Sequence, residues 1–96
     1  MALNVKNGAS DLARLLKAAG NESRLRILCL MGRKRGLCVS ELSDELGLSV
    51  AVVSHHMRAL ARAGVLTADK NGKRVCYRFG RKGMGKELQA LVCKYI

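Results

Sequence analysis

Apolar residues recur at helical spacing in five segments of this chain, and one further stretch alternates between apolar and polar residues. The spacing predicts helices over about residues 10–19, 22–31, 39–46, 49–64 and 83–96, and the alternation predicts a β-hairpin over about residues 65–79. Ser10, Asn21 and Ser49 stand at N-cap positions, and Gly20 and Gly47 stand where a helix would end. The pattern predicts a mainly α-helical domain with one small hairpin.

The two helices within residues 39–64 are separated by a tight turn at Gly47, which is the outline of a helix-turn-helix. At about 100° per residue, one face of the second helix combines Ala51, Ser54, His55, Arg58 and Arg62. The opposite face combines Val53, Met57 and Leu60. Small, polar and cationic groups on the first face suit the major groove of DNA. Any solvated helix also has a polar face, so this helix alone leaves both interpretations open.

A cationic hairpin follows directly. Asn71-Gly72 favours a two-residue type I′ turn, and the alternation after it predicts inward positions for Val75, Tyr77 and Phe79 and outward positions for Arg74, Cys76 and Arg78. Residues 49–79 hold six basic residues and one acidic residue, a net +5 out of the chain's +11. The partner should be a polyanion. Three aromatic residues are too few to stack splayed RNA bases, and no basic amphipathic helix carries large apolar membrane anchors, so duplex DNA is favoured.

Ten residues of the predicted second helix and hairpin are the candidate DNA contacts. Contacts to base edges are expected from Val50, Ala51, Ser54 and His55. Contacts to phosphates are expected from Ser49, Arg58, Arg62, Lys70, Lys73 and Arg74.

Residues 1–96 are predicted to form one domain, which is small enough that oligomerisation would add useful burial. The first residues do not resemble a signal peptide, and no apolar run approaches the roughly 18 residues of a membrane span. We therefore expect a cytoplasmic protein without membrane contacts. In that compartment the four cysteines are not expected to form structural disulfides, and they would serve as buried fillers or as chemical sensors.

Three segments, LKAAGNESRLRIL (16–28), VSELSDELGLSVAVVSHHMRALARAGVL (39–66) and KNGKRVCYRF (70–79), resemble the ArsR/SmtB family of bacterial winged-helix repressors. The resemblance implies five helices, with the hairpin, or wing, between the fourth and the fifth. It also implies a homodimer formed through the first and last helices, both of which have an apolar side. The implied function is that of a transcriptional repressor, not an enzyme, which binds a palindromic operator.

Two cysteines carry a narrower resemblance. Cys29 in the second helix and Cys93 in the last helix look similar to the paired thiols of a family branch that responds to persulfides and related reactive sulfur species. The resemblance implies that sulfane sulfur joins the two thiols through one or more extra sulfur atoms. This bridge would change the spacing between the two DNA-contacting helices of the dimer, one from each subunit. The alternative is that Cys29 is simply a small buried hydrophobe.

Cys38 is a further candidate thiol, because it stands at the N-cap position before Glu41, where the positive end of a helix favours the thiolate. It matches the first cysteine of the family's ELCVCDL metal motif, which reads GLCVSEL here (36–42). Ser40 replaces the second cysteine, and the last helix lacks the Asp and His ligands of the family's other site, so neither a metal nor a cofactor is predicted.

His55 and His56 are adjacent and cannot share a metal ion, and His56 is predicted to be structural. Cys76 is predicted to be a tolerated surface residue.

Three alternative functions remain. The first is a repressor that responds to arsenite, antimonite or another thiophilic metal through some other set of the four thiols. The second is an architectural protein that binds DNA by charge without sequence preference. The third, a small thiol enzyme, is disfavoured because no CxxC motif occurs and no acid or histidine is spaced to serve a given cysteine as base.

Overall fold

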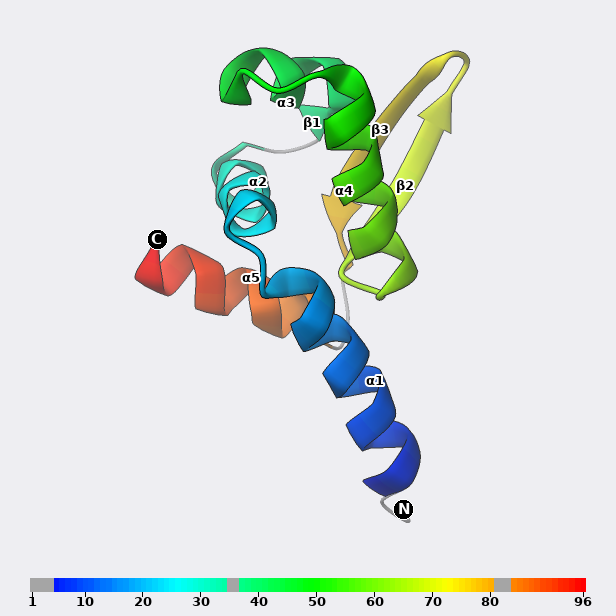
Figure 1. Ribbon diagram of the computed structural model, residues 1–96, viewed down its shortest axis with the longest axis vertical. Helices are drawn as coiled ribbons and strands as arrows, with labels where there is room; N and C mark the ends of the chain where they lie inside the picture. Colours follow the sequence, from blue (N-terminus) through cyan, green and yellow to red (C-terminus); the bar gives the residue numbers. More distant parts are fainter. Residues whose placement is uncertain (1–4, 35–36, 81–83) are drawn as a thin grey trace.

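The computed structural model describes residues 5–34, 37–80 and 84–96, with the side chains of the first helix described from residue 8 onward. In this described part of the chain, five helices and three short strands form a winged helix-turn-helix (Figure 1). The sequence predicted this architecture, its five helices and the hairpin, but not the additional strand β1. The elements, in chain order, are α1 (Val5–Ala19), α2 (Glu22–Arg33), β1 (Leu37–Cys38), α3 (Val39–Leu46), α4 (Val50–Arg62), β2 (Leu66–Asn71), β3 (Arg74–Phe79) and α5 (Met84–Tyr95). Within the described residues, no helix is both long and apolar enough to cross a membrane.

Local capping signals fix most of the helix ends. The Asn21 side chain accepts a hydrogen bond from the Arg24 N–H at 3.1 Å, and Ser49 Oγ accepts one from the Val52 N–H at 3.1 Å. Gly47 ends α3 in the left-handed region, with φ of 65°, a conformation that glycine adopts without strain. The prediction that Ser10 caps the first helix is wrong. Helix α1 begins at Val5, and Ser10 lies inside it.

The wing belongs to a three-stranded antiparallel sheet of order β1-β3-β2, because the two residues of β1 pair with β3. The predicted turn is wrong by one residue. Asn71 pairs with Arg74, so the turn residues are Gly72 and Lys73. Of these two, only Gly72 has a positive φ, whereas a type I′ turn requires positive φ at both. The observed register places the buried Leu66 opposite the buried Phe79.

The core lies between α2, α3, α4 and the inner face of the sheet, and α5 covers it from the other side (Figure 1). Its innermost side chains are fully excluded from solvent and come from α2, α3, α4 and the residue before β2: Ile27, Leu28, Leu42, Val53, Met57, Leu60 and Val65. Helix α1 contributes Leu15, and α5 contributes Leu88 and Val92. The N-terminal half of α1 projects beyond this body (Figure 1). The packing holds α4 and the wing side by side, with their outer faces free.

Candidate DNA-binding surface and thiol sites

The predicted reading face lies on the outside of α4. Val50, Ala51, His55, Arg58 and Arg62 are exposed, and Ser54 is half-buried. Val53, Met57 and Leu60 on the opposite face are fully buried, as the periodicity predicted. Ser49 is exposed, but its hydroxyl already caps the helix. Arg62 Nε reaches back to the Arg58 carbonyl oxygen at 3.4 Å, so these two cations are neighbours on one helical turn.

The wing adds cations beside this face. Lys70 and Lys73 are exposed at its tip. Arg74 is exposed and also forms an ion pair with Glu41 Oε1 at 3.3 Å, and Arg78 pairs with Asp69 at 2.9 Å. Lys70 and Lys73 form no ion pair among the described residues, whereas the charges of Arg74 and Arg78 are partly offset.

An open cavity of about 240 Å³ lies where α3, α4 and β3 meet. Its walls include two of the predicted base-reading residues, Val50 and Ser54, and two of the predicted phosphate-binding residues, Lys73 and Arg74. The other lining residues are Cys38, Val39, Ser40 and Val75. Sequence reasoning missed two residues of the wider surface: Ser40, which lines this cavity, and Val52, which lies outside it. Val52 is an exposed apolar side chain on the first turn of α4. The apolar pattern assigned Val52 to neither face of the helix. Its exposure beside polar residues of α4 shows that it belongs to the outer surface.

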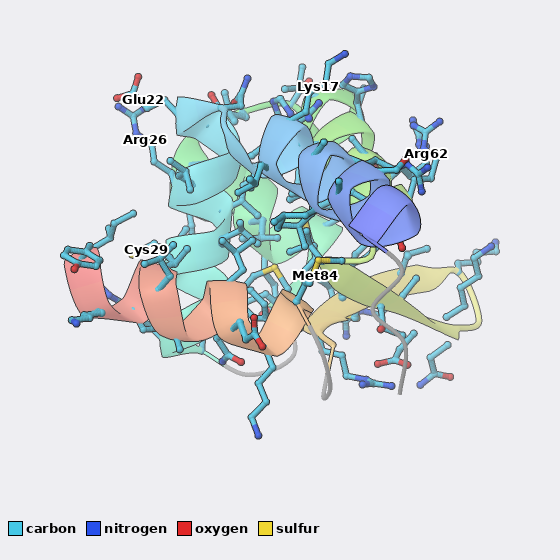
Figure 2. The ribbon with its side chains drawn as sticks, turned by 90° about the horizontal axis from the view of Figure 1, so that it is seen from below. Lys17, Glu22, Arg26, Cys29, Arg62 and Met84 are labelled. Carbon is cyan, nitrogen blue, oxygen red and sulfur yellow. A yellow bond between two sulfur atoms is a disulfide. The ribbon has the colours of Figure 1, made fainter. Side chains whose placement is uncertain are left out.

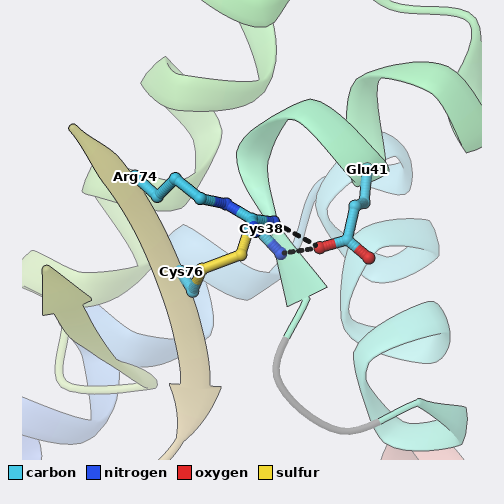
Figure 3. The surroundings of a disulfide bond; sticks show 4 residues. All are labelled: Cys38, Glu41, Arg74 and Cys76. Atoms are coloured by element: carbon cyan, nitrogen blue, oxygen red, sulfur yellow. Dashed lines mark hydrogen bonds and ion pairs between the residues drawn. A yellow bond between two sulfur atoms is a disulfide. The ribbon is translucent and has the colours of Figure 1, made fainter. Parts of the chain in front are cut away.

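Cys38 and Cys76 form a disulfide, which corrects two predictions (Figure 3). The chain was expected to contain no structural disulfide, and Cys76 was expected to be a tolerated surface residue. The physical reason is the register of the sheet: Cys38 in β1 lies directly opposite Cys76 in β3, with the Cα atoms 3.8 Å apart. Cys38 is buried and Cys76 is half-buried. Cys38 also stands at the N-cap position of α3, as predicted, and its N–H donates to Glu41 Oε1 at 3.3 Å.

The other two cysteines are free thiols on packed helices. Cys29 is half-buried on α2 (Figure 2). Cys93 is exposed on α5. The sulfur of Cys93 lies against Gly32 of α2, so closely that a Cβ atom on Gly32 would come within 2.5 Å of it. Gly32 is three residues after Cys29 and therefore on the same side of the helix. The fold thus brings the Cys93 thiol to the stretch of α2 that carries Cys29.

The two histidines have separate surroundings. His55 is exposed, whereas the His56 Nδ1 atom accepts a hydrogen bond from Arg24 Nε at 3.1 Å. Burial, and secondarily the positive charges of Arg24 and His55, lower the pKa of His56. His56 is therefore held neutral and links α2 to α4, in keeping with its predicted structural role. Among the described residues, no group of three or more His, Cys, Asp or Glu side chains is arranged to hold a metal ion.

An apolar surface remains uncovered on α1 and α5. Leu16 and Leu91 are each 53% exposed, and Tyr95 is 72% exposed. A shallow cavity of about 150 Å³ joins the two helices and is lined by Leu12, Leu15, Leu16, Met84, Glu87, Leu88 and Leu91. Apolar patches of this kind mark association surfaces in small domains.

Comparison with known proteins identifies the family. A family model described as "Bacterial regulatory protein, arsR family" matches residues 21–68, from the cap of α2 into β2. The transcriptional activator HlyU of Vibrio cholerae is 38% identical over 92 residues, which cover 93% of this chain and 83% of HlyU. The chain belongs to the arsR family of regulatory proteins.

Solved structures agree with this membership of the arsR family. The structure of HlyU from Vibrio cholerae matches with a TM-score of 0.77 at 33% identity, over 92% of this chain and 95% of that chain. A winged helix-turn-helix DNA-binding domain of Mycobacterium bovis, solved as a homodimer, matches with a TM-score of 0.80 at 27% identity, over 96% of this chain and 83% of that one. A cadmium resistance regulatory protein CadC homolog of Staphylococcus aureus is 32% identical over 75% of this chain, which spans 60% of that protein.

Proposed function

We propose that this chain is a homodimeric, sequence-specific DNA-binding repressor of the cytoplasm, and that cysteine chemistry switches its affinity for its operator. The observation that carries the DNA part is the exposed first half of α4 beside the cationic wing. Small side chains at Ala51 and Ser54 allow the helix backbone to approach base edges, and His55 extends further. The related HlyU is named an activator; the same protein–DNA contact represses when the operator overlaps a promoter.

In this proposal the ten candidate residues divide by chemistry. Val50, Ala51, Ser54 and His55 contact base edges in the major groove, and the remaining six residues hold phosphates and set the register. In a two-fold symmetric dimer, two α4 helices would enter successive major grooves about 34–36 Å apart.

The dimer would form through the uncovered apolar surface of α1 and α5. Leu16, Leu91 and Tyr95 are large side chains that a solitary domain would leave in water. The homodimeric Mycobacterium bovis domain supports the same state for this chain.

Cys29 and Cys93 would be the sensing thiols. Each thiolate attacks the outer sulfur of one organic persulfide, which gives two protein persulfides and releases two thiols. The outer sulfur of one protein persulfide then attacks the inner, cysteine-derived sulfur of the other. Hydrogen sulfide is expelled, and a trisulfide remains between α2 and α5. The seat of the Cys93 sulfur against Gly32 supports this pairing.

The switch would reach DNA through α2. Arg24 of α2 holds His56 of α4 by a 3.1 Å hydrogen bond, so a displacement of α2 toward α5 is transmitted to the reading helix. A shift of about 1–3 kcal/mol in the coupling between the two sites is enough to change operator occupancy substantially.

The DNA proposal is tested by the salt dependence of binding to a duplex that the reduced protein selects from a random library. We expect Arg58→Ala to weaken binding to selected and random duplexes about equally and to flatten the slope of log affinity against log salt by about one unit per subunit. Arg26→Ala is the matched control, because Arg26 lies on α2 and pairs with Glu22 at 3.0 Å, away from the wing (Figure 2). An unchanged slope in Arg58→Ala would remove this residue from the interface. A selected-to-random affinity ratio near one would favour the architectural alternative.

A second candidate inducer is a thiophilic metal or metalloid, which the relationship to a cadmium resistance regulator favours. We expect glutathione persulfide to release the wild-type protein from DNA and to leave Cys29→Ser bound, whereas arsenite, antimonite and cadmium release neither. Release of both proteins by arsenite would favour the metalloid sensor.

A further inference from the structure

We propose that Cys38 and Cys76 form a second, reversible dithiol–disulfide pair, which fastens the wing to the helix-turn-helix and exchanges with low-molecular-weight disulfides. This pair is separate from Cys29 and Cys93. Its chemistry stands on geometry alone, and only its effect on DNA affinity rests on the proposed function.

The sheet brings the two cysteines together across 38 residues of sequence. Strand β1 is two residues long, and its second residue is paired with Cys76. Cys38 is at the same time the N-cap residue of α3. A bond between these sulfurs therefore joins the first helix of the helix-turn-helix directly to a wing strand.

The other links at this junction are weak. Glu41 accepts the Cys38 N–H and also pairs with Arg74 of β3, each at 3.3 Å (Figure 3). The Arg74 and Glu41 side chains are 66% and 48% exposed, so solvent screens their ion pair. With the sulfurs reduced, this screened ion pair and a two-residue ladder, whose Leu37 and Tyr77 are buried in the core, hold the wing at that edge.

Small reagents can reach the pair. Cys76 is half-buried, and Cys38 lines the open cavity of about 240 Å³ between α3, α4 and β3. Lys73 and Arg74 line the same cavity and give it positive charge. A small disulfide that carries carboxylates, such as oxidised glutathione, fits that charge. In reducing compartments, protein disulfides are usually transient or redox-sensing ones.

The exchange is balanced in atoms and electrons. The Cys76 thiolate attacks one sulfur of the small disulfide, which forms a mixed disulfide and releases one small thiol. The Cys38 thiolate then attacks the Cys76 sulfur, breaks the mixed disulfide and releases the second small thiol. Two electrons pass from the protein dithiol to the small disulfide, and the two thiol protons end on the two released thiols. Excess reduced glutathione reverses both steps.

The bond should strengthen DNA binding. Lys73 and Arg74 lie on the wing, and a wing fixed in place loses less conformational freedom when these cations engage phosphates. We expect the disulfide form to bind a selected duplex roughly three- to tenfold more tightly than the reduced form. The pair would thus act in the opposite direction to the proposed bridge between Cys29 and Cys93.

The chemical part is tested with full-length Cys29→Ser/Cys93→Ser protein equilibrated with reduced and oxidised glutathione at graded ratios. Peptide mass spectrometry should find Cys38 joined to Cys76 at oxidising ratios and two free thiols at reducing ratios. Glutathione attached to either cysteine without a Cys38–Cys76 bond at any ratio would overturn the proposal, as would a bond that no ratio reduces.

The affinity part uses the same protein on the duplex selected from a random library. Oxidation should tighten binding three- to tenfold, and the further change Cys38→Ser should abolish the difference. Serine is a strong N-cap, so this variant keeps α3 capped and separates loss of the thiol from loss of the fold. Equal affinity of the oxidised and reduced forms would overturn the proposed effect of the disulfide on DNA binding. Absence of binding to any duplex in both forms would overturn the proposed function, and this effect with it. The mass spectrum would still show whether Cys38 and Cys76 form a reversible disulfide.

Discussion

Replacing Gly32 with alanine should separate the proposed sulfur chemistry from the stability of the fold. Gly32 lies on α2 under the sulfur of Cys93, and the added methyl carbon would come within 2.5 Å of that sulfur. Non-bonded heavy atoms are comfortable at about 3.5–4.0 Å, so the thiol has to move by about 1 Å or more. Cys93 is exposed, and its side chain can rotate into solvent at little cost.

The magnitude follows from two opposing terms. Alanine favours the helical conformation over glycine by about 1 kcal/mol, so Gly32→Ala should stay folded and unfold within about 1 kcal/mol of the wild-type free energy. Joining Cys93 to Cys29 would force the thiol back against the new methyl group. Overpacking of this kind costs about 1–3 kcal/mol, which corresponds to a roughly five- to 150-fold slower bridge formation.

The assay follows bridge formation with glutathione persulfide by mass spectrometry, as the gain of sulfur and loss of two hydrogens on the joined Cys29 and Cys93 peptides. Gly8→Ala is the matched control, because Gly8 also lies in a helix and a Cβ atom there meets nothing within 4 Å. The control should bridge at the wild-type rate. Wild-type bridging in Gly32→Ala would refute the inferred approach of Cys93 to α2, and unfolding of this variant would refute the statement that the exposed thiol can yield.

Three further predictions concern stability and assembly. Leu42→Ala should lower the free energy of unfolding by about 2–5 kcal/mol in urea titrations, because Leu42 is fully buried between α3 and the rest of the core; a loss below about 1 kcal/mol would mean that the site collapses around the change. Because the pKa of His56 is lowered on folding, the unfolded chain binds more protons below pH 6.5, so stability should be complete above that pH and decline as the pH falls toward the folded-state value. His56→Gln should flatten this decline, and an unchanged pH profile would exclude His56 as its source. Leu91→Glu should shift the sedimentation of the chain from dimer to monomer without unfolding it, since Leu91 is 53% exposed; a persistent dimer would exclude the α5 surface as the seam.

Short-range signals predicted several of the helix ends well. The caps at Asn21 and Ser49 and the glycine stop at Gly47 depend on neighbours three or four residues away, so the sequence shows them directly. The start of α1 was predicted wrongly because a local pattern can also mislead. Ser10 satisfies a local N-cap pattern, yet the helix continues back to Val5, and a serine that follows helical residues has no cap to make.

The reading surface was predicted in composition but not in full. Helical periodicity separated the buried Val53 from the exposed His55 and Arg58. The same periodicity could not reveal that Ser40 of α3 lines one cavity with Lys73 of the wing, because that neighbourhood depends on how three elements pack.

By itself, the sequence determined the order of the elements, the faces of the helices, the excess of positive charge on α4 and the wing, and membership of the arsR family. Each of these features depends on residues that lie close together along the chain. The tertiary structure alone decided the register of the wing, the third strand and the pairing of Cys38 with Cys76. A two-residue strand has no period to detect. The pairing of cysteines 38 positions apart depends on the register of β1 against β3, in which the neighbouring residues Leu37 and Tyr77 pair and are both buried in the core.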